Sequence, residues 1–93
     1  MMTETEVIAH IEGLSSARLE LCIREAWVTP AHTSRGRVFD ALDLARLRLI
    51  AELADDLLVD DNAMPIILSL IDQIHGLRRR LHQLGAPRDP GLN

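Results

Sequence analysis

The chain has 93 residues, which is the size of one small domain and leaves no room for a second. Acids outnumber bases by 14 to 10, and the net charge of -4 argues against a nucleic-acid binder, since such proteins are normally basic. Apolar residues make up 47% of the chain but aromatic residues only 2%, so the core must be aliphatic, a composition that favours helices.

Cysteine usage and hydropathy indicate the compartment. Cys22 is the only cysteine, which excludes an intramolecular disulfide and a zinc cluster of thiolates, and suits a reducing cytoplasm. The first residues lack the charged and apolar regions of a signal peptide, and no apolar stretch approaches the roughly 20 residues that span a bilayer. We therefore expect a soluble cytoplasmic protein that does not enter a membrane.

The N-terminal third of the chain predicts two helices joined by a turn. Thr3 and Glu6 have the spacing of a capping box, and Ser15 can cap a second helix after Gly13, which can adopt a positive φ. The second helix must end before Pro30, and its apolar face comprises Leu19, Cys22, Ile23 and Ala26. Two helices around a tight glycine turn predict a helix-turn-helix.

The middle of the chain predicts a small wing and then a helix. Between Val28 and Phe39, bends at proline, serine and glycine separate β-branched or aromatic residues, which favours two short strands. Asp40 can cap a third helix with Asp43 in its first turn, and we expect this helix to end near Leu58. Its predicted buried stripe comprises Leu42, Ala45, Leu49, Leu53 and Leu57.

The fourth helix has the clearest periodicity in the sequence. Asp60, Asp61 or Asn62 can cap it, and Pro65 fits only in or near its first turn. Its apolar residues alternate spacings of three and four, as the a and d positions of a heptad do: Ile67, Leu70, Ile74, Leu77, Leu81 and Leu84. This seam predicts a homodimer, although a helix packed on its own domain is the open alternative.

These patterns divide the chain into a winged helix-turn-helix domain at residues 1–59, a coiled-coil-like helix at residues 60–85 and a disordered tail at residues 86–93. The third helix and the turn after it hold two arginines and six acids, whereas the C-terminal third holds four arginines and two acids. Arg78 and Arg80 flank the heptad seam without an acid beside them, so acids of the third helix are their better partners.

No residues indicate catalysis or cofactor binding. No nucleophile stands beside a base, and no glycine-rich phosphate loop occurs. Cys22 shares the apolar face of the second helix, which predicts a small buried hydrophobe. His75 and His82 are seven residues apart on one flank of the last helix, but two imidazoles without a third ligand make a weak metal site. We expect a protein without enzyme activity, cofactor or metal.

The order of elements resembles the MerR family of transcription regulators. GLSSARLELCIREAWVTP occupies the place of that family's turn and recognition helix, and the wing and third-helix positions are filled by Arg37, Phe39, Asp43, Leu44, Leu47 and Ile50. Where the family holds DNA phosphates with an arginine and two tyrosines, this chain has Glu20, Leu21 and Cys22. A carboxylate in the groove opposes DNA binding, because phosphate neutralisation supplies most of the nonspecific affinity.

The main alternative is a MerR-like regulator that binds DNA, because four arginines could still contact phosphates: Arg18, Arg24, Arg35 and Arg37. Their plainer interpretation is a solvated rim around the helix pair, with Arg24 paired to Glu20 one helical turn away. Surface pairs of that kind contribute only about 0.3 to 0.5 kcal/mol.

The chain is also similar, over nearly its whole length, to the chaperone-modulator family called CbpM, which keeps the MerR-like frame without the DNA-reading residues. VFD opens the third helix, an acidic break lies at Asp60, and LSLIDQIHGL leads into an arginine-rich leucine helix. Asp61 stands where that family has a tryptophan. With the element order, the resemblance implies an all-α winged helix-turn-helix with a two-stranded wing and a long C-terminal dimerisation helix. It also implies a homodimer that binds the J-domain of a DnaJ-like cochaperone, CbpA, and restrains its action on DnaK.

A competitor for a J-domain should offer carboxylates, because J-domains present a basic helix to DnaK. Helical spacing places Glu52, Asp55 and Asp56 on neighbouring solvent-facing positions, with Asp60 and Asp61 just beyond. We predict that these five acids bind the partner, and their charge would mainly speed the encounter. A solvated helix face without a partner is the alternative for the acids, and a plain structural adaptor is a third function that the sequence allows.

Overall fold

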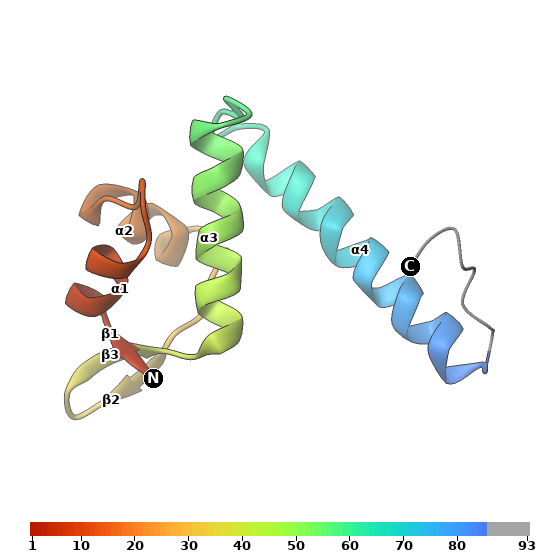
Figure 1. The fold of residues 1–93 in the computed structure, drawn as a ribbon, viewed down its shortest axis with the longest axis horizontal. Helices are drawn as coiled ribbons and strands as arrows, with labels where there is room; N and C mark the ends of the chain where they lie inside the picture. The colour runs from red at the N-terminus through yellow and green to blue at the C-terminus, as the bar shows by residue number, and fades with distance from the viewer. Residues whose placement is uncertain (86–93) are drawn as a thin grey trace.

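Four helices and a three-stranded antiparallel sheet make up residues 1–85, the part of the chain that the computed structural model describes (Figure 1). In chain order the elements are β1 (Met2–Thr3), α1 (Glu4–His10), α2 (Ser16–Arg24), β2 (Ala31–Thr33), β3 (Gly36–Phe39), α3 (Ala41–Asp55) and α4 (Met64–Gln83). A mostly helical fold is thus confirmed. The predicted disordered tail, residues 86–93, lies outside the described residues.

The helix starts predicted from capping patterns are confirmed for the first three helices. At α1 the Glu6 N–H donates to Thr3 Oγ1 at 3.4 Å, and the Thr3 N–H donates to Glu6 Oε1 at 3.2 Å. At α2, Ser15 Oγ accepts a backbone N–H at 3.1 Å. At α3, Asp40 and Asp43 exchange the same pair of bonds at 2.9 and 3.1 Å. Local side-chain chemistry therefore fixes where these helices begin.

Helix α2 ends earlier than the proline rule alone requires. Its last residue is Arg24, and Ala26 adopts a left-handed φ of 57°. The chain turns back there, so that the Trp27 N–H donates to the Cys22 carbonyl at 2.8 Å. Ala26 is consequently exposed and lies outside the buried face that we predicted for α2, which Leu19 and Cys22 form.

The sheet has one more strand than predicted. The expected pair, β2 and β3, forms a hairpin in the register Ala31↔Val38 to Thr33↔Gly36. β1 pairs with the other edge of β3, giving the order β1-β3-β2. A strand of two residues has no room for the alternation that marks a strand in a sequence, which is why β1 was missed. Its pairing fixes the start of α1 against the centre of the sheet.

The predicted buried stripe on α3 is wrong for most of its residues. Leu42 is 78% exposed and Leu57 is 69% exposed, and Ala45 is also exposed. The buried positions are Leu47, Ile50, Ala51 and Leu53. The helix carries two apolar stripes of helical spacing, and periodicity does not say which of them meets the core. It also ends at Asp55, three residues before the expected Leu58, which has a left-handed φ of 54°.

The hydrophobic core joins α1, α2, α3 and the sheet, and α4 enters it only with its first turns. Met64 and Leu68 are the buried residues of α4, and Ile67 and Ile71 pack partly against the core. Pro65 lies in the first turn, as predicted. The predicted cap at Asp60, Asp61 or Asn62 is wrong, because the N-cap of α4 is Ala63, without a side-chain hydrogen bond. Asp60 instead accepts the Ala63 N–H at 2.8 Å in the turn that leads into the helix. Beyond these turns α4 diverges from α3 and projects from the domain (Figure 1).

Candidate functional site

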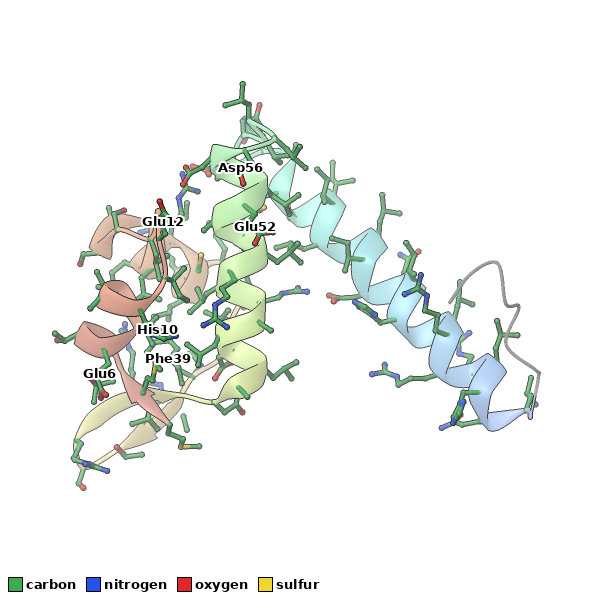
Figure 2. The ribbon with its side chains drawn as sticks, in the orientation of Figure 1. Glu6, His10, Glu12, Phe39, Glu52 and Asp56 are labelled. Atoms are coloured by element: carbon green, nitrogen blue, oxygen red, sulfur yellow. The ribbon has the colours of Figure 1, made fainter. Side chains whose placement is uncertain are left out.

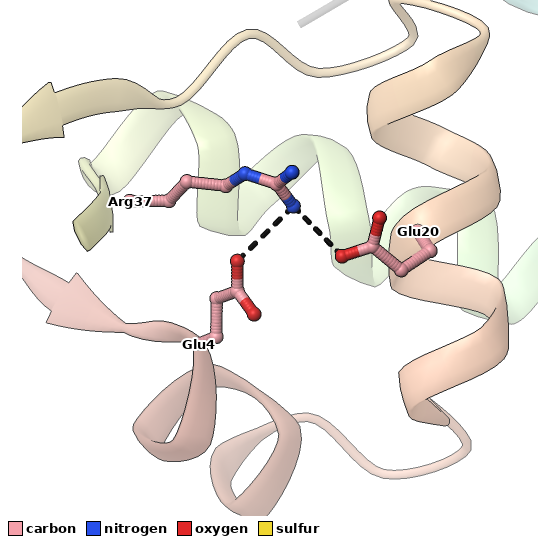
Figure 3. Close-up of polar contacts among 3 residues, drawn as sticks. All are labelled: Glu4, Glu20 and Arg37. Atoms are coloured by element: carbon pink, nitrogen blue, oxygen red, sulfur yellow. Dashed lines mark hydrogen bonds and ion pairs between the residues drawn. The ribbon is translucent and has the colours of Figure 1, made fainter.

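Arg37, on β3, is held between two carboxylates on the helix-turn-helix side of the domain (Figure 3). Its Nη1 donates to Glu20 Oε1 of α2 at 2.7 Å and to Glu4 Oε1 of α1 at 3.1 Å. The hydrogen bond to Glu20 is the largest cause that raises the pKa of Arg37 above its ordinary value. We call these three residues the Arg37 clamp. The predicted pair of Glu20 with Arg24 is wrong, since Glu20 reaches across to the sheet instead.

The other arginines considered for DNA contact are placed differently from one another. Arg18 is half-buried, and its Nη1 is enclosed without a hydrogen bond within residues 1–85, with Asp61 Oδ1 at 3.7 Å. Arg24 and Arg35 are exposed, and neither forms an ion pair within the same residues. Two of the four guanidiniums are therefore free at the surface.

The predicted acidic patch divides in two. Asp60 accepts a backbone hydrogen bond and Asp61 lies beside Arg18, so both have local roles. Glu52, Asp55 and Asp56 are exposed at the C-terminal end of α3, without an ion pair in the described chain. Figure 2 shows Glu52 and Asp56 there. These three carry the free negative charge of the patch.

Glu12 extends this patch from another element. A β-carbon added at Gly13 would meet the Asp55 carboxylate, so the turn between α1 and α2 lies directly against the end of α3. Glu12, the residue before that glycine, is exposed there (Figure 2). We call Glu12, Glu52, Asp55 and Asp56 the acidic face. Sequence reasoning missed Glu12, because only the tertiary contact brings it beside residues about 40 positions away.

The heptad seam of α4 is mostly exposed. Ile67 is half-buried against the core, whereas the remaining residues are between 48% and 81% exposed: Leu70, Ile74, Leu77, Leu81 and Leu84. We call these five the leucine stripe. Met64, Leu68 and Ile71 face the domain from the other side of the helix. The alternative in which the seam packs on its own domain is therefore wrong for the leucine stripe.

One ion pair braces α4 against α3. Arg46 donates to both carboxylate oxygens of Asp72, at 2.7 and 3.0 Å, and through Nε to the Trp27 carbonyl at 3.1 Å. The hydrogen bond from Arg46 lowers the pKa of Asp72. Beside this brace, a groove of about 770 Å³ between the helices has Trp27, Leu42 and Ile71 among its walls. The α3 acids proposed as partners for Arg78 and Arg80 do not form ion pairs with them in residues 1–85.

The described residues contain no group of three or more histidine, cysteine or acidic side chains that could hold a metal ion. Cys22 is fully buried, and this burial raises the pKa of its thiol to about 11. None of the helices within residues 1–85 has the length and apolar character needed to cross a bilayer.

Comparison with protein families gives a match over most of the chain. The family described as MerR HTH family regulatory protein matches residues 3–85, which run from the end of β1 to just beyond α4. Searches of curated proteins and of solved structures found no match.

Proposed function

The chain belongs to the family of MerR HTH regulatory proteins, and from this premise we propose that it regulates another protein rather than a promoter. Its proposed partner is the J-domain of a DnaJ-like cochaperone of the CbpA type. Its proposed effect is to keep that J-domain from stimulating DnaK. The protein then acts without enzyme activity, by occupying a surface that the chaperone needs.

The acidic face is the observation that carries this proposal. Its four carboxylates come from two elements and are exposed at one end of the domain, and no arginine within residues 1–85 pairs with them. A basic helix of a J-domain is complementary to such a surface. Complementary charge steers the encounter and selects against acidic partners more than it deepens the affinity.

The helix-turn-helix face supports the same choice of partner. Glu20 is exposed on α2, Leu21 is half-buried and Cys22 is buried, so these positions offer no donor to a DNA phosphate. The similarity to CbpM proteins, which extends through the arginine-rich end of α4, supports a J-domain as the specific partner. A homodimer formed through the leucine stripe completes the proposal, because these side chains are apolar and uncovered.

Binding kinetics with a purified J-domain test the proposal. Wild-type protein is compared with E52K and with D56K, which each reverse one charge of the acidic face. Glu25, an exposed acid outside that face, gives E25K as the matched control. We expect slower association for E52K and D56K than for E25K, with the difference shrinking as salt screens the charges. Biolayer interferometry over a salt series measures both rates.

Absence of J-domain binding by the wild-type protein would exclude the proposed partner. Equal association rates for the three variants would move the binding site away from the acidic face. An assay of DnaK ATP hydrolysis, stimulated by the full cochaperone, then shows whether binding also restrains the chaperone.

A MerR-like regulator that binds DNA is the second candidate, and the family match favours it. The exposed Arg24 and Arg35 would then contact phosphates. This function requires tight binding of a promoter duplex that weakens steeply with salt. The logarithm of the binding constant should fall with the logarithm of the salt concentration, with a slope of about -0.9 for each phosphate contact. R24Q and R35Q would each reduce that slope. Duplex binding and J-domain binding are therefore separable measurements.

A further inference from the structure

We infer that Glu4 and Glu20 exclude nucleic acid from the helix-turn-helix face. Both carboxylates bind the Arg37 guanidinium, so they take the place that a phosphate oxygen would take on the same group. The Arg37 clamp thereby closes this face to polyanions from within the chain. The inference concerns exclusion of nucleic acid and does not depend on the identity of the protein partner.

The strand before α1 brings Glu4 close to Arg37. β1 and β3 are antiparallel in the register Met2↔Phe39 and Thr3↔Val38, so Glu4 follows directly after the residue that pairs with Val38, the neighbour of Arg37. Glu4 is also the first residue of α1, whose start is held by its capping box. The position of this carboxylate follows from the fold and needs no rearrangement of the chain.

Glu20 approaches Arg37 from the other side. It projects from α2, a helix that Leu19 and Cys22 anchor in the core. Arg37 itself lies on the central strand, paired with His32 of β2. Three elements therefore hold the three charged groups, and all of them pack against the same core. A clamp held by rigid elements persists better than a pair of flexible surface side chains.

The net charge of the clamp also repels a polyanion, in addition to keeping Arg37 from binding a phosphate. Two carboxylates and one guanidinium leave a net charge of -1 at the place where the hairpin meets α2. A phosphate that approaches would have to displace both glutamates from a single nitrogen. Neutral side chains at both positions would instead leave Arg37 without a carboxylate partner, as the exposed Arg24 and Arg35 already are within residues 1–85.

The double variant E4Q/E20Q tests the clamp, with E12Q/E25Q as the matched control. Each removes two negative charges, but neither control residue forms an ion pair within residues 1–85. The probe is a fluorescein-labelled DNA duplex of arbitrary sequence, titrated by fluorescence anisotropy at several salt concentrations. We expect E4Q/E20Q to bind more tightly than the control, with a logarithmic salt slope steeper by about 0.9 for one added phosphate contact.

Addition of R37Q to E4Q/E20Q should abolish the gain. R37Q alone should bind no more tightly than the wild-type protein, because it leaves the Glu4 and Glu20 carboxylates in place without their cation. Equal binding by E4Q/E20Q and its control, a gain that survives R37Q, or tighter binding by R37Q alone would each overturn the inference. The last variant keeps the inference testable if E4Q/E20Q does not fold, which circular dichroism shows.

Discussion

At the scale of single residues, the buried Cys22 gives the protein a distinct response to alkaline pH. Burial raises the pKa of its thiol from the ordinary value of 9.0 to about 11, so the folded state holds this proton more tightly than the unfolded chain does. The stabilisation is fully present below pH 9 and is lost as pH rises toward 11. One pKa unit corresponds to about 1.4 kcal/mol, so the loss is about 2 to 3 kcal/mol over that window.

The composition makes this prediction easy to measure. The chain has no lysine and no tyrosine, so Cys22 is the only side chain that titrates between pH 9 and 11. Urea unfolding at a series of pH values should show the free energy of unfolding falling over this window. In C22A the free energy of unfolding should no longer fall between pH 9 and 11, although the smaller side chain lowers it at every pH. A slope that persists in C22A would contradict the prediction.

At the scale of elements, the turn between α1 and α2 depends on a glycine. Gly13 has a φ of +82°, and a β-carbon there would meet the Asp55 carboxylate. G13A should lower the free energy of unfolding by more than about 1 kcal/mol, because alanine disfavours this φ and displaces Asp55. Gly76 gives the matched control, since it lies inside α4 with open space around its Cα. G76A should raise helix stability by up to about 1 kcal/mol.

Urea unfolding of the two variants checks this contrast, because the substitution is the same and only the backbone conformation differs. A second variant, G13A/D55A, separates the two causes. If displacement of Asp55 dominates, D55A should recover most of the loss; if the left-handed backbone dominates, the loss should persist. Equal effects of G13A and G76A would mean that the turn tolerates a side chain.

The elements also show what the sequence could predict. The caps at Thr3, Ser15 and Asp40 join groups that lie within one turn of chain, so the spacing of residue types already specifies them. The face of α3 could not be predicted in that way. Its two apolar stripes have the same periodicity, and only the tertiary packing decides that Leu47 is buried in the core while Leu42 lines the groove beside α4.

Charged contacts between elements were less predictable still. Glu20 could pair with Arg24 at helical spacing, yet the fold brings Arg37 nearer, 17 positions away along the chain. Glu12 joins the acidic face for the same reason, through the contact of Gly13 with Asp55. Acids of α3 were correctly expected to be exposed, because a helix end rich in carboxylates cannot be buried without partners.

At the scale of the whole molecule, the leucine stripe predicts a dimer. L77D/L81D should convert the protein to a monomer, because each aspartate would have to be buried without a partner in a helix pair. Sedimentation velocity measures the change. The matched control is H75D/H82D, which introduces the same two aspartates on another side of α4 and should remain dimeric. A dimer that survives L77D/L81D would show that the stripe lies outside the interface.

The single tryptophan gives the molecule a built-in optical probe. Trp27 lies in the core at the wall of the groove between α3 and α4, and its carbonyl accepts the Arg46 hydrogen bond. With no tyrosine in the chain, its emission is free of tyrosine fluorescence. A ligand that lodges between these helices would shift the emission wavelength, whereas docking on the acidic face, none of whose carboxylates lines the groove, would leave it constant. Unlabelled protein can thus distinguish the two modes of recognition.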